Sequence, residues 1–416
     1  MKAICGGRLV MHDRIEEGKA ILFEDKIIGI VPESEVPAEA ERIEVNGALV
    51  TPGLFDVHIH GSGGCDTMDG SEEALRTIAS TVVKNGVTRF LATSVTLPLD
   101  RTAKVFDLVR TVVGKSGEGW DGAVIEGINM EGPFIHPAYK GAHEENYIAD
   151  FDFDFMKQYS DVIRVVTVAP DKEGGMEFIR KVTTETPIKV SIGHTAATYE
   201  QAMEAIENGA TQVTHLYNAM TPMHHRKPGV VTAALRSDVY TEMICDTIHV
   251  HPAMFQFVMD CKGKDKFVLI TDCMRAGGMP QGEYTLGELK VVVDETSARL
   301  MDGTLAGSIL TLNKAIDNVH KNYNTAEVLG DDTGVTGVTI RHSDGKERTL
   351  AISGFFVAIG HHPNTELFRD QLELDAEGYI RTEGSSSRTS VEGVFAAGDV
   401  HPTFSGRDAI SFSNKM

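Results

Sequence analysis

Short apolar runs recur along the middle of the chain, and amphipathic stretches fill most of the intervals between them. The interval at 71–78 begins with a serine followed by two glutamates, and the interval at 198–209 begins with a threonine and ends with a glycine. These are signals for helix starts and a helix stop. Strand and helix alternating eight times predict an α/β fold of the TIM-type (β/α)8 class. The expected strands are 54–60, 87–95, 123–131, 162–170, 188–195, 211–217, 240–250 and 266–272.

The two ends of the chain show different patterns. Residues 1–50 alternate between apolar and polar positions and predict a small antiparallel β domain. After the barrel, 283–306 is again β-like, and we expect it to form the small β domain together with the N-terminal strands. The segment 308–323 predicts a further helix. Strands at 335–341 and 349–359 then predict a β meander. We therefore expect four parts: a small β domain (1–50), a barrel with a β insertion at 283–306 (51–323), a foreign β-rich fragment (324–400) and an unassigned tail (401–416).

The charge and cysteine usage exclude several classes of partner. The 416-residue chain has a formal net charge of −21, which argues against nucleic acid and anionic membranes because both recruit clustered Lys and Arg. A transmembrane helix needs about 18 successive apolar residues, and the sequence has no such run. Its N-terminus becomes charged too early for a signal peptide. Five cysteines without a CxxC pair favour a reducing, cytoplasmic location.

Ligand-type side chains stand where the predicted barrel strands end. His58 and His60 are two positions apart, so they share one face of the first strand. Carboxyl ends of barrel strands build the active site in this fold. Each residue alone fits an ordinary buried or surface polar group, but the joint pattern predicts a divalent-metal site of the Zn²⁺ or Fe²⁺ type. The other members of this set are Glu131, His194, His215, His249 and Asp272.

Six motifs within 1–320 resemble those of the N-acetylglucosamine-6-phosphate deacetylases of the amidohydrolase superfamily. They are TPGLFDVHIHG, EGPF, GHT, THLYNAM, ITDCMRAGG and DGTLAGS, in that order. The resemblance implies hydrolysis of the acetamide of a small phosphorylated amino sugar by an enzyme that holds one or two metal ions. It also implies a homodimer.

The resemblance also implies roles for individual residues. Glu131, His194 and His215 correspond to ligands of the principal metal. His58 and His60 correspond to the pair that binds a second ion in those members that keep it. Further residues correspond to a catalytic acid/base (Asp272), to the group that polarises the acetyl carbonyl (His143), to substrate contacts (Asn218, Ala219, His249) and to an arginine that reaches the phosphate bound by the neighbouring subunit (Arg226).

The chemistry of amide hydrolysis suits these residue types independently of the resemblance. A metal lowers the pKa of water and so provides a nucleophile at neutral pH. Asp272 can take a proton from that water and return it to the departing amine. His143 can stabilise the developing oxyanion, and Arg226 can supply the donor that a phosphate requires, although an exposed solvated arginine is the simpler interpretation of that residue.

The segment 325–400 resembles part of the FAD domain of bacterial thioredoxin reductases instead. The stretches that carry this resemblance are GVTGV, GFFVAIGHHPNT, GYI and TSVEGVFAAGDV, with Asp399 at the flavin-contacting position. The GxGxxG fingerprint and the CxxC redox pair of a reductase are missing from the sequence. The sequence therefore indicates a fusion of two unrelated pieces, and we expect no functional FAD.

Three alternatives to a sugar-phosphate deacetylase stay open at this point. One is an amidohydrolase acting on another N-acyl or cyclic amide, which the lack of a candidate carboxylated lysine at a strand end disfavours. Another is a flavin oxidoreductase, which the missing pyrophosphate loop disfavours. The last is an inactive fusion that retains only the barrel.

Overall fold

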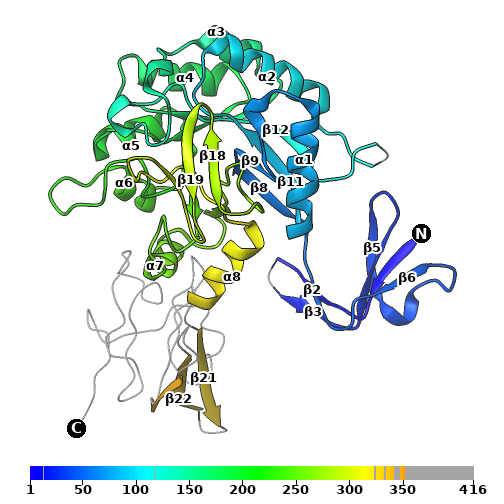
Figure 1. Ribbon diagram of the computed structural model, residues 1–416. Coiled ribbons are helices and arrows are strands. Elements are labelled where there is room, and N and C mark those ends of the chain that lie inside the picture. Colours follow the sequence, from blue (N-terminus) through cyan, green and yellow to red (C-terminus); the bar gives the residue numbers. More distant parts are fainter. Residues whose placement is uncertain (13, 118, 323–324, 332–333, 342–346, 352–416) are drawn as a thin grey trace, which may run out of the picture. The chain divides into compact units, whose positions relative to one another are not determined.

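The computed structural model describes residues 1–351 except for 13, 118, 323–324, 332–333 and 342–346 (Figure 1). The chain divides into two compact units, Met1–Val319 and His320–Met416, and each is described by itself. Asp399 and the reductase-like stretches from 354 onward lie outside the described residues, as does the end of the strand expected at 349–359.

Eight parallel strands form the barrel in sequence order, which confirms the predicted fold class. The first and last strands meet where Ile59 bridges to Cys273 and the Asp272 amide donates to the His58 carbonyl over 2.9 Å. We call this junction the closing seam. The strands are β8 (Leu54–Ile59), β11 (Val87–Thr93), β12 (Val124–Met130), β13 (Ile163–Val168), β14 (Lys189–Ile192), β15 (Gln212–Val213), β16 (Tyr240–Ile244) and β17 (Phe267–Ile270).

Several of these strands end earlier than the apolar runs predicted. His194, His215 and Asp272 follow the last residues of β14, β15 and β17, and all three adopt a positive φ. A left-handed residue cannot continue a strand, so the chain turns away at that position. The polar ends of the runs are therefore loop residues at the barrel mouth rather than strand residues.

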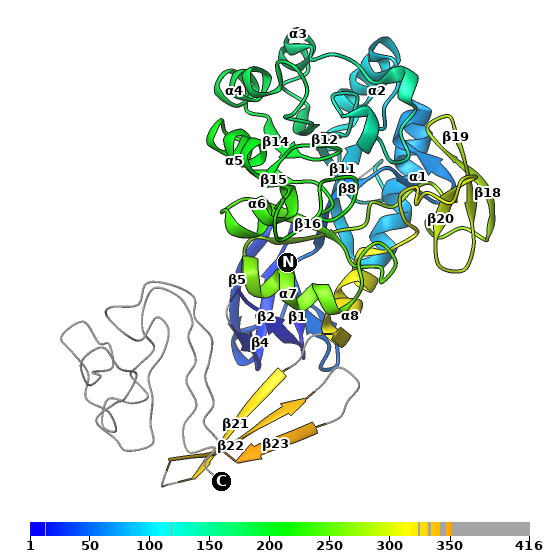
Figure 2. The same cartoon turned by 90° about the vertical axis from the view of Figure 1, so that its left-hand side faces the viewer.

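Helices alternate with the barrel strands and cover their outer side (Figure 2). The expected caps are confirmed, because the Ser71 side chain accepts from the Ala74 amide and Thr198 forms a capping box with Gln201. The helices are α1 (Glu72–Val82), α2 (Leu99–Val112), α3 (Phe153–Gln158), α4 (Gly175–Glu185), α5 (Tyr199–Glu207), α6 (Val230–Arg236), α7 (Ala253–Lys262) and α8 (Leu312–Asn322). Among the described helices, none is long and apolar enough to cross a membrane.

The N-terminal β domain has two small sheets and is mixed rather than purely antiparallel. β1 runs parallel to β6, and β2 runs parallel to β7. The expectation of an antiparallel unit was wrong here because the segment 33–40 carries the chain across before β6 begins, so β6 enters from the same end as β1. The strands are β1 (Lys2–Cys5), β2 (Arg8–Val10), β3 (Ile15–Glu16), β4 (Lys19–Phe23), β5 (Ile27–Pro32), β6 (Glu41–Glu44) and β7 (Leu49–Val50).

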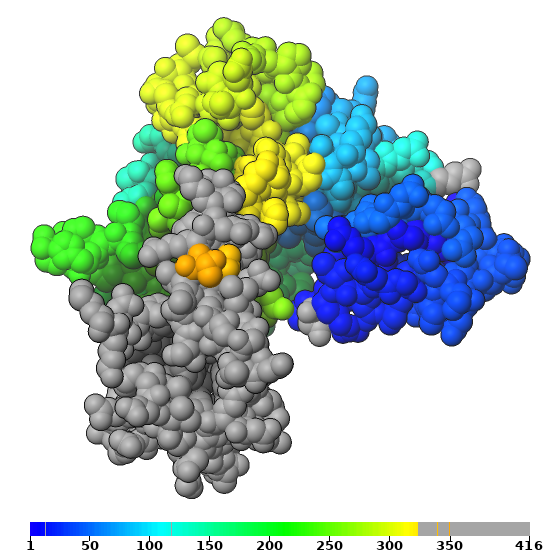
Figure 3. Space-filling view, turned by 90° about the horizontal axis from the view of Figure 1, so that it is seen from below, coloured from blue at the N-terminus to red at the C-terminus, as the bar shows by residue number. Residues whose placement is uncertain are grey.

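A β insertion follows the last barrel strand and packs over part of the barrel mouth. Its antiparallel strands are β18 (Gly282–Leu286), β19 (Leu289–Val293) and β20 (Ala298–Leu300). Their apolar side chains share a core with Val95, Ala142 and Met274 from barrel loops. In Figures 2 and 3 this insertion and the N-terminal β domain occupy separate places on the barrel. They form separate sheets with separate cores, so 283–306 does not join the small β domain as the sequence led us to expect. The insertion therefore belongs to the wall of the mouth. A short hairpin of β9 (Gly61–Ser62) and β10 (Cys65–Asp66) follows β8.

The described part of the second unit contains the predicted meander. β21 (Thr325–Asp331), β22 (Gly334–Arg341) and β23 (Glu347–Ala351) pair in an antiparallel order. The strand predicted at 335–341 is β22, and the strand predicted from 349 begins two residues earlier.

Candidate metal centre

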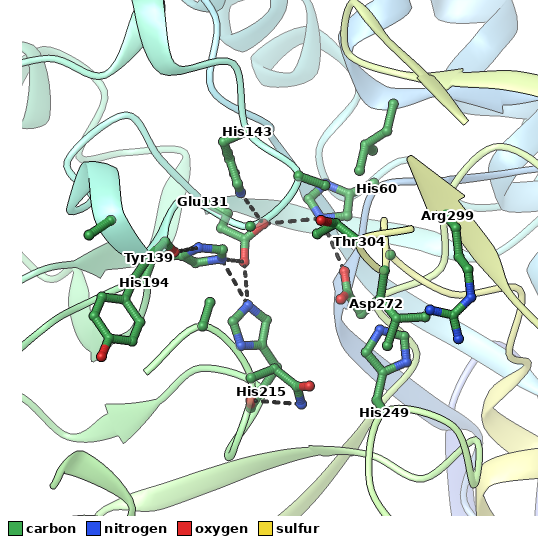
Figure 4. A pocket seen from close by; sticks show the side chains of 18 residues that line it. His60, Glu131, Tyr139, His143, His194, His215, His249, Asp272, Arg299 and Thr304 are labelled. Carbon is green, nitrogen blue, oxygen red and sulfur yellow. Dashed lines mark hydrogen bonds and ion pairs between the residues drawn. The ribbon is translucent and has the colours of Figure 1, made fainter. Parts of the chain in front are cut away.

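Glu131 stands at the centre of a group of imidazoles at the barrel mouth (Figure 4). It follows β12, and its Oε1 lies 3.2 Å from His194 Nε2 and 3.0 Å from His215 Nε2. The two imidazole nitrogens are themselves 3.0 Å apart. Three ligand-type atoms from three strand ends therefore converge on one point.

His58 and His60 form a second group with the same carboxylate. His60 Nε2 lies 3.2 Å from Glu131 Oε2, and His58 Nε2 lies 3.4 Å from Glu131 Oε1. All three side chains are buried. The structure therefore brings together two triads that share Glu131.

Asp272 faces both groups from the closing seam. Its Oδ1 lies 3.2 Å from His60 Nε2 and 3.6 Å from His58 Nε2. Its backbone is fixed on both sides, by the bond to the His58 carbonyl and by a 2.7 Å bond from the Ser308 amide to its own carbonyl. The carboxylate is thus held beside the triads by main-chain contacts.

Glu242, which sequence reasoning missed, supports the cluster from inside the barrel. It lies on β16 and is fully buried. Its Oε2 is 3.0 Å from His58 Nδ1 and accepts from the His215 amide over 3.2 Å, while its Oε1 accepts from the Gln212 side chain. An acidic residue inside an apolar strand was the available signal. The carboxylate orients His58 so that Nε2 points at the centre.

The donor atoms fit a divalent cation. His194 Nδ1 donates to the Tyr139 carbonyl over 2.9 Å, which leaves the Nε2 lone pair directed at Glu131 and His215. His58 Nε2 is buried without a hydrogen-bond partner. Lone pairs packed this closely repel one another unless a cation or a proton lies between them. Imidazole nitrogen and carboxylate oxygen are the ligands that Zn²⁺ and Fe²⁺ accept.

The pKa values of the cluster also indicate that it favours the binding of a cation. Burial acts to raise the pKa of Glu131, but the imidazoles of His58 and His194 outweigh it and hold that pKa well below its ordinary range. Burial likewise opposes ionisation of Asp272, yet the hydrogen bond from His60 and the nearby imidazoles lower its pKa to about 2. Burial acts to lower the pKa of His60, but the same carboxylates raise it to about 9. A bound cation would take the place of the protons that this arrangement attracts.

His143 lies beside the cluster in a neutral form. The Thr96 amide donates to His143 Nδ1 over 3.2 Å, so the proton of the neutral ring is on Nε2. Nε2 lies 3.3 Å from Glu131 Oε2. Burial lowers the pKa of His143 to about 4, which keeps the ring uncharged at neutral pH. The residue can therefore present a single N–H to a ligand in front of the cluster.

A cavity of about 480 Å³ opens onto the cluster, a size that suits a small ligand. Asn218, Ala219 and His249 line it, together with most of the cluster, whereas the fully buried His58 stands behind its wall. Arg226 does not line it. That residue is exposed on the loop before α6, and its Nη1 contacts the His225 ring over 2.8 Å. Arg299, which sequence reasoning also missed, lines the cavity from the insertion.

Two families of known proteins match this chain in overlapping segments. The model of the amidohydrolase family matches residues 49–335, and that of the pyridine nucleotide-disulphide oxidoreductases matches 299–411. The N-acetylglucosamine-6-phosphate deacetylase of Lysinibacillus sphaericus is 41% identical over 287 residues, which are 68% of this chain and 73% of that protein. The N-acetylgalactosamine-6-phosphate deacetylase of Escherichia coli O157:H7 is 36% identical over 68% of this chain and 75% of its own length.

A solved structure extends the likeness to three dimensions. The N-acetylglucosamine-6-phosphate deacetylase of Pasteurella multocida superposes with a TM-score of 0.70 at 28% identity, covering 84% of this chain and 98% of that chain. The second family model agrees with the reductase-like motifs of the tail, and its match begins inside the first. Over residues 49–335, which include the barrel, this chain belongs to the amidohydrolase family.

Proposed function

We propose that this protein hydrolyses the acetamide of N-acetylglucosamine 6-phosphate, giving glucosamine 6-phosphate and acetate. The observation that carries the proposal is the convergence of Glu131, four imidazoles and Asp272 at the mouth of an amidohydrolase barrel. Relatives that are 41% and 36% identical to this chain, which are deacetylases of hexosamine 6-phosphates, support it. The reaction belongs to the catabolism of amino sugars.

Glu131, His194 and His215 would hold the principal ion, and His58 and His60 would hold a second one with Glu131 as the shared ligand. Zinc or iron suits this donor set best. A divalent ion held by these residues would supply a water nucleophile at neutral pH and would polarise the acetyl carbonyl. The protein fixes the ligands beforehand, through Glu242 behind His58 and through the Tyr139 carbonyl behind His194.

The proton transfers fall to Asp272, which stands next to both triads. Its carboxylate accepts a proton from the attacking water and delivers it to the nitrogen of the amide as the C–N bond breaks. The Nε2–H of His143 donates to the acetyl oxygen as negative charge develops there. Asn218, Ala219 and His249, which line the cavity, would contact the sugar.

We further propose a homodimer in the cytoplasm. Arg226 is exposed on a loop and stands outside the cavity of its own subunit, which supports a role toward the phosphate bound by a neighbouring one. The five cysteines are all free, which supports a reducing compartment.

The tail is proposed to be a separate piece. We propose that 324–400 is a thioredoxin-reductase-like fragment fused to an amidohydrolase that occupies 1–323, with 401–416 belonging to neither. The change of family model near the end of the barrel supports this division.

Acetate release tests the proposal directly. The substrates are N-acetylglucosamine 6-phosphate, its galactosamine epimer and unphosphorylated N-acetylglucosamine, with metal content measured on the same sample. We expect turnover of the glucosamine 6-phosphate derivative that a chelator abolishes and added metal restores. Faster turnover of the galactosamine epimer would change the assigned sugar. No acetate from any substrate by a fully metal-loaded sample would refute the proposed activity.

A further inference from the structure

One wall of the cavity carries a permanent positive charge. Arg299 lies on β20 of the insertion, and among the residues that line this cavity in the described part of the chain it is the single Arg or Lys. Its side chain is half-buried. The remaining cavity residues are apolar, are neutral polar, or belong to the metal centre and its histidines. A ligand with an anionic group would therefore meet one fixed cation here.

Residues on both sides of β20 hold the guanidinium of Arg299 in place. Its Nε donates to Ser297 Oγ over 3.2 Å, and its Nη1 donates to the Gly303 carbonyl over 2.9 Å. Ser297 is itself buried and fixed by Asp294, which accepts from its amide over 2.8 Å. Neither bond of the guanidinium uses Nη2. An arginine fixed in this way loses little side-chain entropy when it binds an anion.

The charge of Arg299 is not neutralised by a neighbouring carboxylate. Within the described residues, no Asp or Glu oxygen forms an ion pair with it, whereas Arg275 near the same wall pairs with Asp69 over 2.8 Å. Asp302 in the adjacent turn is bound to the Thr304 amide over 3.0 Å instead. In a protein with a net charge of −21, an arginine without a carboxylate partner at a concave surface is a natural anion contact.

The position of Arg299 suits the end of a substrate that is remote from the reacting bond. Figure 4 shows Arg299 and His249 on one side of the cavity and His194 and Tyr139 on the other, with Glu131 and Asp272 between them. His249 Nδ1 is held by Asp246 at 2.6 Å, so its Nε2 is free to face a ligand. A substrate with its acetamide at Glu131 and Asp272 can extend its other end toward Arg299.

We propose that Arg299 binds the phosphate of the substrate from within the subunit that carries out the reaction. The inference rests on the proposed deacetylase function and names a residue of that site that determines specificity. It divides the recognition of the phosphate between two sources, the insertion of the same subunit and Arg226 of a neighbouring one. A subunit without a neighbour would then keep part of its preference for phosphorylated sugars.

The test compares Arg299→Gln and Arg299→Lys with Arg180→Gln, which removes the same charge from an exposed position on α4. Metal-loaded proteins are assayed with N-acetylglucosamine 6-phosphate and with N-acetylglucosamine. We expect Arg299→Gln to raise KM for the phosphorylated sugar about 10- to 100-fold, the value of a charge-assisted hydrogen bond, with little change in kcat or toward the unphosphorylated sugar. Arg299→Lys should recover part of the loss, and Arg226→Gln should add to it.

A binding measurement separates failure of this inference from failure of the proposed activity. D-Glucose 6-phosphate carries the phosphate but no acetamide, and its affinity for the metal-loaded protein is measured by calorimetry without turnover. Weaker binding to Arg299→Gln than to Arg180→Gln supports the assignment even in a protein that releases no acetate. Three outcomes would overturn the assignment and leave Arg299 as a structural residue. The first is an equal loss of activity on both sugars in Arg299→Gln. The others are an affinity for glucose 6-phosphate that is unchanged in Arg299→Gln, or that is undetectable in the unsubstituted protein.

Discussion

His194, His215 and Asp272 adopt a positive φ, a backbone conformation that is rare for residues other than glycine. Their φ angles are 47°, 26° and 50°. Each such residue costs on the order of 1–3 kcal/mol, and the barrel around it must compensate. This conformation orients the side chains, because the turn directs each of them back across the barrel mouth toward Glu131. At this scale the sequence indicates which residues gather, but it does not indicate how the backbone aims them.

His194 provides a direct test of the metal ligands. His194→Ala removes one imidazole of the Glu131–His194–His215 triad while leaving the strand before it intact. We expect most of the bound metal to be lost, measured by elemental analysis of protein purified in parallel with the unsubstituted chain. His224→Ala, a change in an exposed loop, is the matched control. Metal content equal to that of the control would remove His194 from the ligand set.

Asp272 tests the proton transfers separately from the metal. Asp272→Asn keeps the size of the side chain and the main-chain bonds to His58 and Ser308. The amide cannot accept a proton from water, so turnover should fall by about 10²–10⁴-fold while metal content and melting temperature stay close to their original values. A variant with near-normal turnover would contradict the assignment of Asp272 as the acid/base.

Among the elements, the barrel strands were predictable and their ends were not. All eight apolar runs became strands because burial of a parallel strand requires a nearly continuous apolar sequence. The strand expected at 211–217 is only Gln212–Val213, since Thr214 and His215 already belong to the turn. The role of Glu242 was not predicted, although this residue lies within a well-formed strand. The sequence shows an acidic residue among apolar ones, but only the closed barrel shows that it faces His58.

Glu242 couples two elements that are far apart in sequence, β16 and β8. Glu242→Gln keeps the shape of the side chain but removes the negative charge behind His58. It also replaces one of the two acceptor oxygens of Glu242 with an NH₂ group, which cannot accept a hydrogen bond from Gln212. We expect metal affinity to fall about 10–100-fold, as is usual for groups that orient metal ligands. Titration of the metal-free protein with Zn²⁺ measures the affinity, and Glu207→Gln, a change at an exposed position of α5, is the control. Identical affinities in the two variants would show that Glu242 only fills the barrel.

At the scale of the whole molecule, the sequence showed that the chain resembles two different families. It did not show that the N-terminal domain has an exposed apolar surface. One face of its sheet carries a row of cross-strand partners, with Ile4 paired to Ile43 and to Ile21, and Ile21 paired to Ile30. Ile30 and Ile43 are 39% and 38% exposed. The opposite face is a small buried core around Ala3 and Leu22. Alternation predicted these strands, but one sequence cannot say which of two apolar faces is covered.

The tail gives a prediction at this scale. A flavin site of the reductase class holds the pyrophosphate at a glycine-rich strand–helix turn, and the sequence has no such fingerprint. Purified protein incubated with FAD and then desalted should therefore show no flavin absorbance. Removal of 325–416 should leave the metal content of the barrel no lower. Stoichiometric FAD would refute the first expectation, and a deletion variant that is insoluble would refute the second.

The closing seam has a consequence for how the protein is made. Asp272 follows His58 by 214 residues, which a ribosome adds in about 10–40 s at its usual rate of roughly 5–20 residues per second. During that interval β8 lacks its partner on one edge, and His58 and His60 stand on a nascent chain without the Asp272 carboxylate. The site is therefore assembled at the end of barrel synthesis. A metal bound in that interval would lack the neighbouring carboxylate of Asp272, so the ligands and the proposed acid/base come together only in the finished barrel.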